Sequence, residues 1–316
     1  MHSSSQPMVH PRGLKHRRHG LMHLLMFIGT FFWAANIIAG KFALRNMSSL
    51  ALAQARVTGA GLIFLAGFAL WRRGARLRLN RRELWYLALT ALFGISLNQV
   101  FFISGIGRTS AAHAGLIVAL GPVMVLMMSC AKQLEALTVL KAVGAAISLA
   151  GVVELTTGKS QPGSAATLTG DVIMLLGSAV FAYFTILVKK IARRYDGLSL
   201  NTIIFAMGAV LMLPITGRDV FATHWIALPP EAWWGIAFLV TLGSVVAYSI
   251  YAFALTELSA TRVAAFNYLQ PVIAATLGVW LLGEALTTHV VVGGMLILIG
   301  VYLTEREGRE PATQPE

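Results

Sequence analysis

The chain has 316 residues, of which 57% are hydrophobic and 12% are charged, and its formal net charge is +12. Soluble domains carry about 25% charged residues, so this composition excludes a soluble fold and predicts an all-α integral membrane protein. The lipid bilayer and a small-molecule substrate are therefore the expected partners, and nucleic acid is not. The single cysteine, Cys130, excludes an intramolecular disulfide.

Residues 1–20 contain four basic residues and no acid, and we predict that they form a basic cytoplasmic tail. The apolar run that begins at Leu21 is longer than the core of a secretory signal, so it predicts a first transmembrane helix. Further apolar segments of about 20 residues follow, each long enough to cross a bilayer. Residues 305–316 are polar and predict a second tail. We predict ten transmembrane helices, over 21–44, 49–71, 84–106, 110–130, 136–156, 168–188, 199–216, 232–256, 260–282 and 287–304.

The distribution of Lys and Arg predicts the orientation of these helices. If both termini are cytoplasmic, 18 of the 25 Lys and Arg residues lie on the inside and five lie outside. Cytoplasmic loops of membrane proteins are enriched in Lys and Arg. We therefore predict a multi-pass protein of the plasma membrane, the bacterial inner membrane, with both termini cytoplasmic.

The chain contains an internal repeat. A shift of 149 residues aligns 94–154 with 243–303 without a gap, and a shift of 148 extends the match more weakly to the first and sixth helices. The two halves, 21–156 and 168–304, each contain five predicted helices, and an odd number inverts the second half relative to the first. Inverted repeats are a recurrent device of secondary transporters. The aligned pairs include Gly94 with Gly243, Pro122 with Pro271, Glu135 with Glu284, Gly144 with Gly293, and Gly151 with Gly300.

The run at 29–41 (GTFFWAANIIAGK), the paired prolines and the paired Glu-Ala-Leu-Thr turns resemble the drug/metabolite transporter superfamily, in its EamA-domain branch. The resemblance covers nearly the whole chain. It implies a ten-helix exporter of amino acids or other metabolites, with the substrate held in a central cavity.

Several polar and aromatic residues are candidates for the lining of such a cavity. Ser244, Tyr248 and Tyr251 share one helix face, and the repeat maps the two tyrosines onto Gln99 and Phe102. Each candidate has a plain structural alternative, such as a helix interface or an interfacial aromatic belt. The predicted substrate-binding residues are Trp33, Asn36, Gln99, Phe102, Tyr183, Tyr248, Tyr251, Asn267 and Gln270, and the predicted helix kinks are Pro122 and Pro271.

Charged residues inside predicted helices are functional candidates by default. Arg56 either attracts an anion, pairs within the protein or snorkels outward. His113 is a candidate for a group that changes charge near neutral pH, and the alternative is a solvated or structural histidine. Lys41 and Glu154 lie near helix ends and are expected to snorkel or set topology, while Glu135 and Glu284 are expected to cap or bond turns.

The leading prediction is a secondary transporter, an exporter of small metabolites that works by alternating access and is not an enzyme. No nucleotide-binding GxxxxGK[ST] loop and no cluster with metal-ligand spacing occurs in the sequence, so we expect no cofactor and no metal. The alternatives are an integral membrane enzyme that acts on lipids or isoprenoids, and a passive solute channel. The sequence leaves the cargo, the direction, the energy coupling and the choice between monomer and homodimer open.

Overall fold

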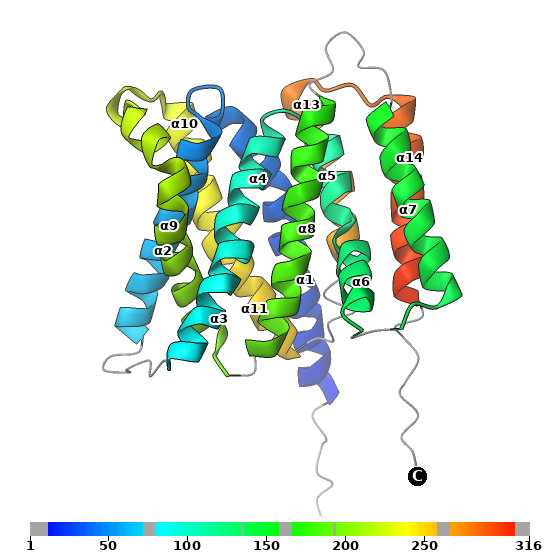
Figure 1. Cartoon of the computed structure of the whole chain (residues 1–316), viewed down its shortest axis with the longest axis horizontal. Coiled ribbons are helices and arrows are strands. Elements are labelled where there is room, and N and C mark those ends of the chain that lie inside the picture. The colour runs from blue at the N-terminus through cyan, green and yellow to red at the C-terminus, as the bar shows by residue number, and fades with distance from the viewer. Residues whose placement is uncertain are drawn as a thin grey trace, which may run out of the picture.

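The computed structural model describes residues 12–71, 80–133, 136–157, 166–191, 194–257 and 266–306. Within these ranges every regular element is helical (Figure 1). Eight helical stretches are long and apolar enough to cross a membrane, and two shorter apolar helices, Leu269–Leu282 and Thr288–Thr304, accompany them. The chain is a multi-pass membrane protein.

In chain order, two successive helices make up each of the spans Arg81–Ile106 and Ala111–Ala131, and the helices of the first half run back and forth between the two faces of the molecule (Figure 1). They are α1 (Arg12–Ala43), α2 (Ser49–Trp71), α3 (Arg81–Ala91), α4 (Asn98–Ile106), α5 (Ala111–Ala119), α6 (Gly121–Ala131) and α7 (Val139–Thr157).

The second half follows the same pattern. Its helices are α8 (Leu168–Ile191), α9 (Gly197–Ala222), α10 (Pro230–Val240), α11 (Ala247–Glu257), α13 (Leu269–Leu282) and α14 (Thr288–Arg306), with short 3-10 turns at Trp225–Ala227 and Phe266–Tyr268.

Two predicted helix boundaries differ clearly from the structure. Helix α1 begins at Arg12, so the helix extends through the last nine residues of the predicted tail, while its apolar span begins at Leu21. A long apolar helix extends into adjoining residues at little cost, because each added residue gains a backbone hydrogen bond once the helix is nucleated. Helix α9 runs through Pro214 to Ala222, beyond the predicted end at 216. The predicted turn residue Glu135 lies outside the described residues.

Two predicted continuous helices are each interrupted by a π-helical segment. The segment η1 (Leu92–Leu97) separates α3 from α4, and η3 (Thr241–Val246) separates α10 from α11. Their first residues are 149 positions apart, which is the shift of the sequence repeat. π-Helical segments often lie at functional sites, because the wider turn redirects side chains and carbonyl groups.

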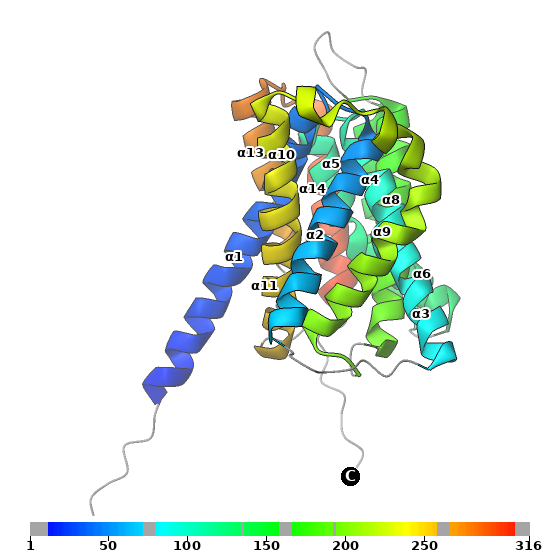
Figure 2. The same cartoon turned by 90° about the vertical axis from the view of Figure 1, so that its left-hand side faces the viewer.

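Helices α7 and α14 cross at glycines near one edge of the molecule, while α2 and α9 pair near the opposite edge (Figures 1 and 2). A Cβ atom on Gly144 would lie 2.6 Å from the carbonyl oxygen of Gly300, and one on Gly151 would lie 2.7 Å from that of Gly293. Small residues allow two membrane helices to approach this closely. Helices α1, α4, α5, α8 and α11 lie between the two edge pairs.

This crossing yields a stability prediction. We expect Gly144→Ala to destabilise the protein by about 1–3 kcal/mol, because the added methyl group overpacks the crossing. The matched control is Gly217→Ala in α9, since a Cβ atom there meets nothing within 4 Å. Thermal unfolding in detergent measures both. Equal melting temperatures for the two variants would contradict the close approach of α7 and α14.

Candidate functional site

Aromatic side chains from three helices meet in the centre of the molecule. The Trp33 ring of α1 lies 5.7 Å from the Tyr248 ring and 5.3 Å from the Tyr251 ring of α11, measured between centroids. Phe205 of α9 packs edge-on against Tyr248 at 5.4 Å. These contacts form a largely apolar wall whose polar atoms are the two tyrosine hydroxyl groups and the indole N–H of Trp33.

Arg56 of α2 lies beside this wall and is only 2% exposed. Its Nε atom donates a 3.0 Å hydrogen bond to the Ser244 hydroxyl, and its Nη2 atom donates a 3.4 Å hydrogen bond to the Gly243 carbonyl. Its guanidinium carbon lies 5.7 Å from the centroid of the Phe102 ring. The side chain therefore points into the protein and does not snorkel.

The Gly243 carbonyl belongs to the π-helical segment η3 and also accepts a 3.4 Å hydrogen bond from Asn36 Nδ2. A Cβ atom on Gly243 would overlap the Asn36 amide, so glycine is required for this approach. Ser244 donates its own hydroxyl proton to the Leu239 carbonyl at 2.9 Å, which leaves its oxygen lone pairs for Arg56. The π-helical segment thus holds the amide and the guanidinium together.

Asn36 Oδ1 and Arg56 Nη1 are buried here without a hydrogen-bond partner among the described residues, and Gln99 Oε1 on α4 is a further atom of this kind. Gln99 Nε2 donates to Asn98 Oδ1 at 3.3 Å, which leaves its oxygen free. Buried polar atoms are nearly always hydrogen-bonded, so the unpartnered ones make this region a candidate site for a bound water or solute. We define the central site as Trp33, Asn36, Arg56, Gln99, Phe102, Ser244, Tyr248 and Tyr251.

Other predicted site residues lie elsewhere. Tyr183 packs against Phe93 at 4.8 Å, and the Lys132 ammonium lies 4.4 Å from the Tyr183 ring centroid, so this residue belongs to a separate cluster. Gln270 is buried on α13, next to Gly115 of α5. The side chain of Asn267 lies outside the described residues.

At both prolines that we predicted to kink a helix, a new helix begins. Helix α5 ends at Ala119, and Pro122 is the second residue of α6. Pro271 is the third residue of α13, directly after the 3-10 turn. A proline is tolerated in the first turn of a helix, where its missing N–H is not needed. At each of these prolines, where we predicted a bend within one helix, the structure has a boundary between two successive helical segments.

A second polar cluster lies at the end of α1 that reaches the upper face in Figure 1. The Lys41 ammonium pairs with Glu284 at 3.1 Å and also donates to the Thr109 carbonyl. The other Glu284 oxygen accepts the backbone N–H of Ala111 at 2.7 Å. Lys41 does not snorkel, because it pairs with a largely buried carboxylate inside the protein, and its role in setting topology stays a prediction. Glu284 does act as a cap, but on α5.

His113 extends this cluster, since its Nδ1 atom lies 2.9 Å from a carboxylate oxygen of Asp171, and the hydroxyl of Thr109 donates to the same carboxylate. We call Lys41, Thr109, His113, Asp171 and Glu284 the upper ion network. Sequence reasoning did not single out Asp171. The available signal was an acid inside the first turn of the apolar segment 168–188.

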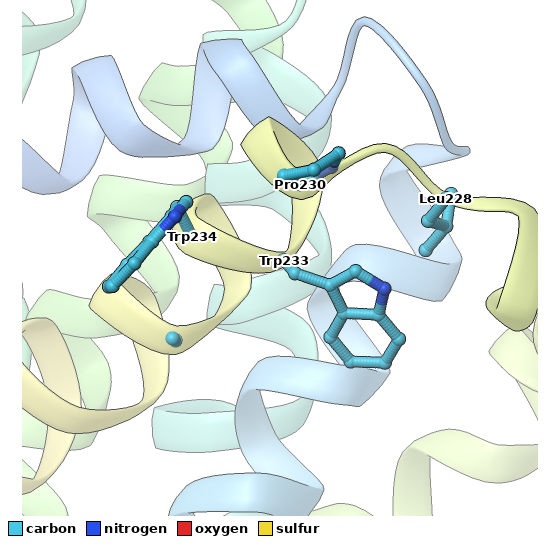
Figure 3. Close-up of a pocket in the computed structure, with 5 residues that line it drawn as sticks. Leu228, Pro230, Trp233 and Trp234 are labelled. Carbon is cyan, nitrogen blue, oxygen red and sulfur yellow. The ribbon is translucent and has the colours of Figure 1, made fainter.

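A surface depression of about 490 Å³ lies over α10 and is formed by Leu228, Pro230, Trp233, Trp234 and Ala237 (Figure 3). Figure 3 shows the indole rings of Trp233 and Trp234 projecting from the start of the helix. Both rings are exposed, and tryptophan is enriched where membrane proteins meet the lipid headgroups. This depression is therefore assigned to the membrane interface and not to the substrate.

Comparison with known proteins gives a consistent family match. The model of the EamA-like transporter family matches residues 20–157 and 168–306. An uncharacterized transporter of Archaeoglobus fulgidus is 30% identical over 283 residues, which cover 89% of this chain and 96% of that protein.

Two other relatives carry more specific names. A probable terminal-alkyne amino-acid exporter of Streptantibioticus cattleyicolor is 27% identical over 278 residues, covering 87% of this chain and 90% of the relative. An S-adenosylmethionine/S-adenosylhomocysteine transporter of Chlamydia trachomatis is 25% identical over 292 residues, covering 90% and 88%. A solved crystal structure aligns with a TM-score of 0.60 at 19% identity, covering 92% of this chain and 99% of that one, which shows a shared fold.

The upper ion network yields a prediction about charge. We expect Glu284→Gln to destabilise the protein by about 3 kcal/mol, because it leaves the largely buried Lys41 ammonium without a counter-charge, although the amide can still accept the N–H of Ala111. The control Glu154→Gln should cost about 1 kcal/mol or less, since Glu154 pairs with His289 at an exposed position.

Thermal unfolding of the purified variants measures both costs, and Lys41→Gln should restore much of the stability lost by Glu284→Gln. A loss of stability that is no greater for Glu284→Gln than for Glu154→Gln would mean that the buried pair contributes nothing.

Proposed function

The chain belongs to the EamA-like transporter family, because the family's model matches both of its halves, and from this premise we propose that it is a secondary transporter that exports small metabolites. The family resemblance predicted from the sequence is thereby confirmed. Amino acids and related amphiphilic compounds are the proposed cargo, and alternating access around the central site is the proposed mechanism. The observation that carries the proposal is the group of unpartnered polar atoms beside an aromatic wall, where helices from both halves meet.

We propose further that the chain crosses the membrane ten times, as two inverted five-helix halves over 21–156 and 168–304. Two separate family matches and the equal spacing of η1 and η3 support this arrangement. So does the crossing of α7 and α14. The repeat equates Gly144 with Gly293 and Gly151 with Gly300, and the structure sets Gly144 against Gly300 and Gly151 against Gly293. A two-fold axis through the crossing would produce that exchange.

The contact between Asn36 and Gly243 has a counterpart of the same kind. A Cβ atom on Gly94 would overlap the Phe184 ring, and the repeat equates Gly94 with Gly243 and Phe184 with Asn36. Each half thus sets its first helix against a glycine in the π-helical segment of the other half. This reciprocal packing supports exchange between two related conformations, as alternating access requires.

The names of two relatives support the proposed cargo class. One is named as an exporter of an amino acid, and the other as a transporter of S-adenosylmethionine, a compound that contains an amino-acid group. The uncharged aromatic wall of Trp33, Tyr248 and Tyr251 suits the apolar part of such a molecule. The proposed assembly is a monomer or homodimer in the bacterial inner membrane.

The orientation is also proposed from charge. Both ends of the described helical region, the start of α1 and the end of α14, lie at the lower face in Figure 1, together with the start of the basic helix α3. Basic segments remain on the cytoplasmic side during insertion. The lower face is therefore proposed to be cytoplasmic, and the upper ion network to lie at the outer face.

Cysteine labelling tests this orientation. In a Cys130→Ser background, we expect Arg45→Cys, after α1, to react with a membrane-impermeant maleimide in intact spheroplasts. We expect Arg82→Cys, in the first turn of α3, to react only after permeabilisation; both positions are exposed. Reaction of both residues from the same side would refute the proposed topology, and the reverse pattern would refute the orientation.

Transport is tested by identifying the cargo and measuring its flux. A solute found by comparing culture media of overexpressing and deletion strains should enter proteoliposomes with saturable kinetics. Tyr248→Ala should raise its half-saturation concentration about tenfold, as expected for loss of a buried aromatic contact. The control Val210→Ala, at an exposed position on α9, should leave it unchanged.

Each alternative function predicts a different result in this assay. A channel would give flux that rises linearly with concentration. A membrane enzyme would convert the solute without moving it. No flux of any solute in the screen would overturn the transporter proposal.

A further inference from the structure

We propose that the upper ion network is a gate, which holds the two halves of the chain together at the upper end and opens when its ion pairs separate. This inference rests on the proposed function, because alternating access requires each end of the central site to open and close. It assigns the upper gate to named side chains, and it makes the described structure the arrangement in which that end is closed.

The position of the network between the two halves is the first observation. Lys41 of α1 belongs to the first half and pairs with Glu284, which follows α13 in the second half. His113 of α5 and Asp171 of α8 form a second pair that also joins one half to the other. A relative movement of the halves at this end would therefore separate both pairs.

The loop between α4 and α5 is the point where the two pairs meet. Its residue Thr109 accepts a hydrogen bond from the Lys41 ammonium through its carbonyl, and donates one to Asp171 through its hydroxyl. A Cβ atom on Gly170 would lie 2.3 Å from the Arg108 carbonyl oxygen, so the start of α8 packs directly on the loop. One short loop of the first half is thus fixed between the ion pair of α1 and the start of α8.

The location of the network relative to the central site is the second observation. Lys41 follows Asn36 on the unbroken helix α1, and at the rise of an α-helix it lies about 7.5 Å further toward the upper face (Figure 1). The side chains of Lys41 and Glu284 are only 12% and 10% exposed. The network therefore lies, largely buried, between the central site and the upper face.

The polar character of these contacts favours a gate over a permanent contact. When a buried ion pair separates, water hydrates each charged group, and this hydration offsets much of the lost attraction. An apolar contact would instead expose apolar surface when it opens. The crossing of α7 and α14 also joins the halves, but it is built on backbone contacts such as Gly144 with Gly300. We therefore expect that crossing to stay closed while the ion network opens.

The lower end is joined in a different way. Glu83, at the start of α3, pairs there with Arg194, which follows α8, so this ion pair also links the two halves. The Arg194 side chain is 65% exposed. Exposed ion pairs stabilise a contact only weakly, because water screens them. The ion pairs of the upper network therefore hold their end of the molecule more firmly than this pair holds the lower end.

The test measures access to the central site from the upper side. In a Cys130→Ser background, Trp33→Cys reacts with a membrane-impermeant maleimide that is applied from the side that labels Arg45→Cys. We expect slow labelling when the network is intact. Lys41→Gln combined with Glu284→Gln should raise the labelling rate about tenfold, because the closed arrangement loses the attraction of one ion pair.

The matched control is Glu154→Gln combined with His289→Gln, which removes an exposed ion pair between α7 and α14 at the same face. This control should leave the labelling rate of Trp33→Cys unchanged. Labelling from the lower side should become slower in the Lys41→Gln/Glu284→Gln protein, because opening of the upper end is proposed to accompany closure of the lower end.

A second measurement covers the case in which the double variant does not fold. Spin labels on Arg45→Cys and Leu286→Cys, both at exposed positions after α1 and α13, report the distance between these helix ends in the Cys130→Ser protein. His113→Gln breaks the other ion pair of the gate. It should increase the share of a longer distance between the two spin labels in pulsed electron resonance.

The outcomes separate this inference from the proposed function. The gate would be overturned if the double variant left the labelling rate unchanged while Trp33→Cys reacted from the lower side, or if the control raised the rate equally. An unchanged distance in a folded His113→Gln variant would overturn it as well. In these cases the transporter proposal would stand. If Trp33→Cys reacted from neither side in any variant, the accessible central site, and with it alternating access and the gate, would be wrong.

Discussion

One backbone carbonyl, that of Gly243, organises the central site. In a membrane every backbone polar group needs a partner inside the protein, and an ordinary helix supplies all of them internally. The π-helical segment η3 alters that pattern, and the Gly243 carbonyl accepts hydrogen bonds from both Asn36 and Arg56. Two polar side chains that would otherwise be excluded from the middle of a bilayer are thereby held together, although they come from two different helices.

The two halves share one packing arrangement but place different side chains in it. On the repeat register, the position of Asn36 in the first half is held by Phe184 in the second, and each packs against a glycine of the opposite π-helical segment. The second half fills its gap with a phenyl ring, and the first half fills its own with an amide. Of these two repeat-related contacts, only the one between Asn36 and Gly243 therefore contributes a polar side chain to the central site. This explains why the motifs shared by the halves, such as the paired prolines, predict the scaffold and not the cargo.

Sequence reasoning predicted what depends on local pattern and missed what depends on contacts between helices. The apolar run 49–71 matches α2, and the shared face of Tyr248 and Tyr251 does contact Trp33. Neither π-helical segment was predicted, because η1 and η3 have the same apolar composition as the helices around them. The role of Arg56 was left open among three alternatives, since its partners are 187 and 188 residues away. Asp171 was missed for the same reason: its partner His113 belongs to the other half.

The central site and the upper ion network are mechanically linked through α1. That helix carries Asn36 in the site and Lys41 in the network, and it is unbroken between them. At Gly40, between the two, a Cβ atom would meet Ile106 of α4 at 2.5 Å, so α1 and α4 pack closely there. Because both residues are on α1, a tilt of that helix would move Lys41 relative to Glu284 and Asn36 relative to the Gly243 carbonyl. Under the proposed alternating access, one movement of α1 would therefore change the central site and the upper ion network together.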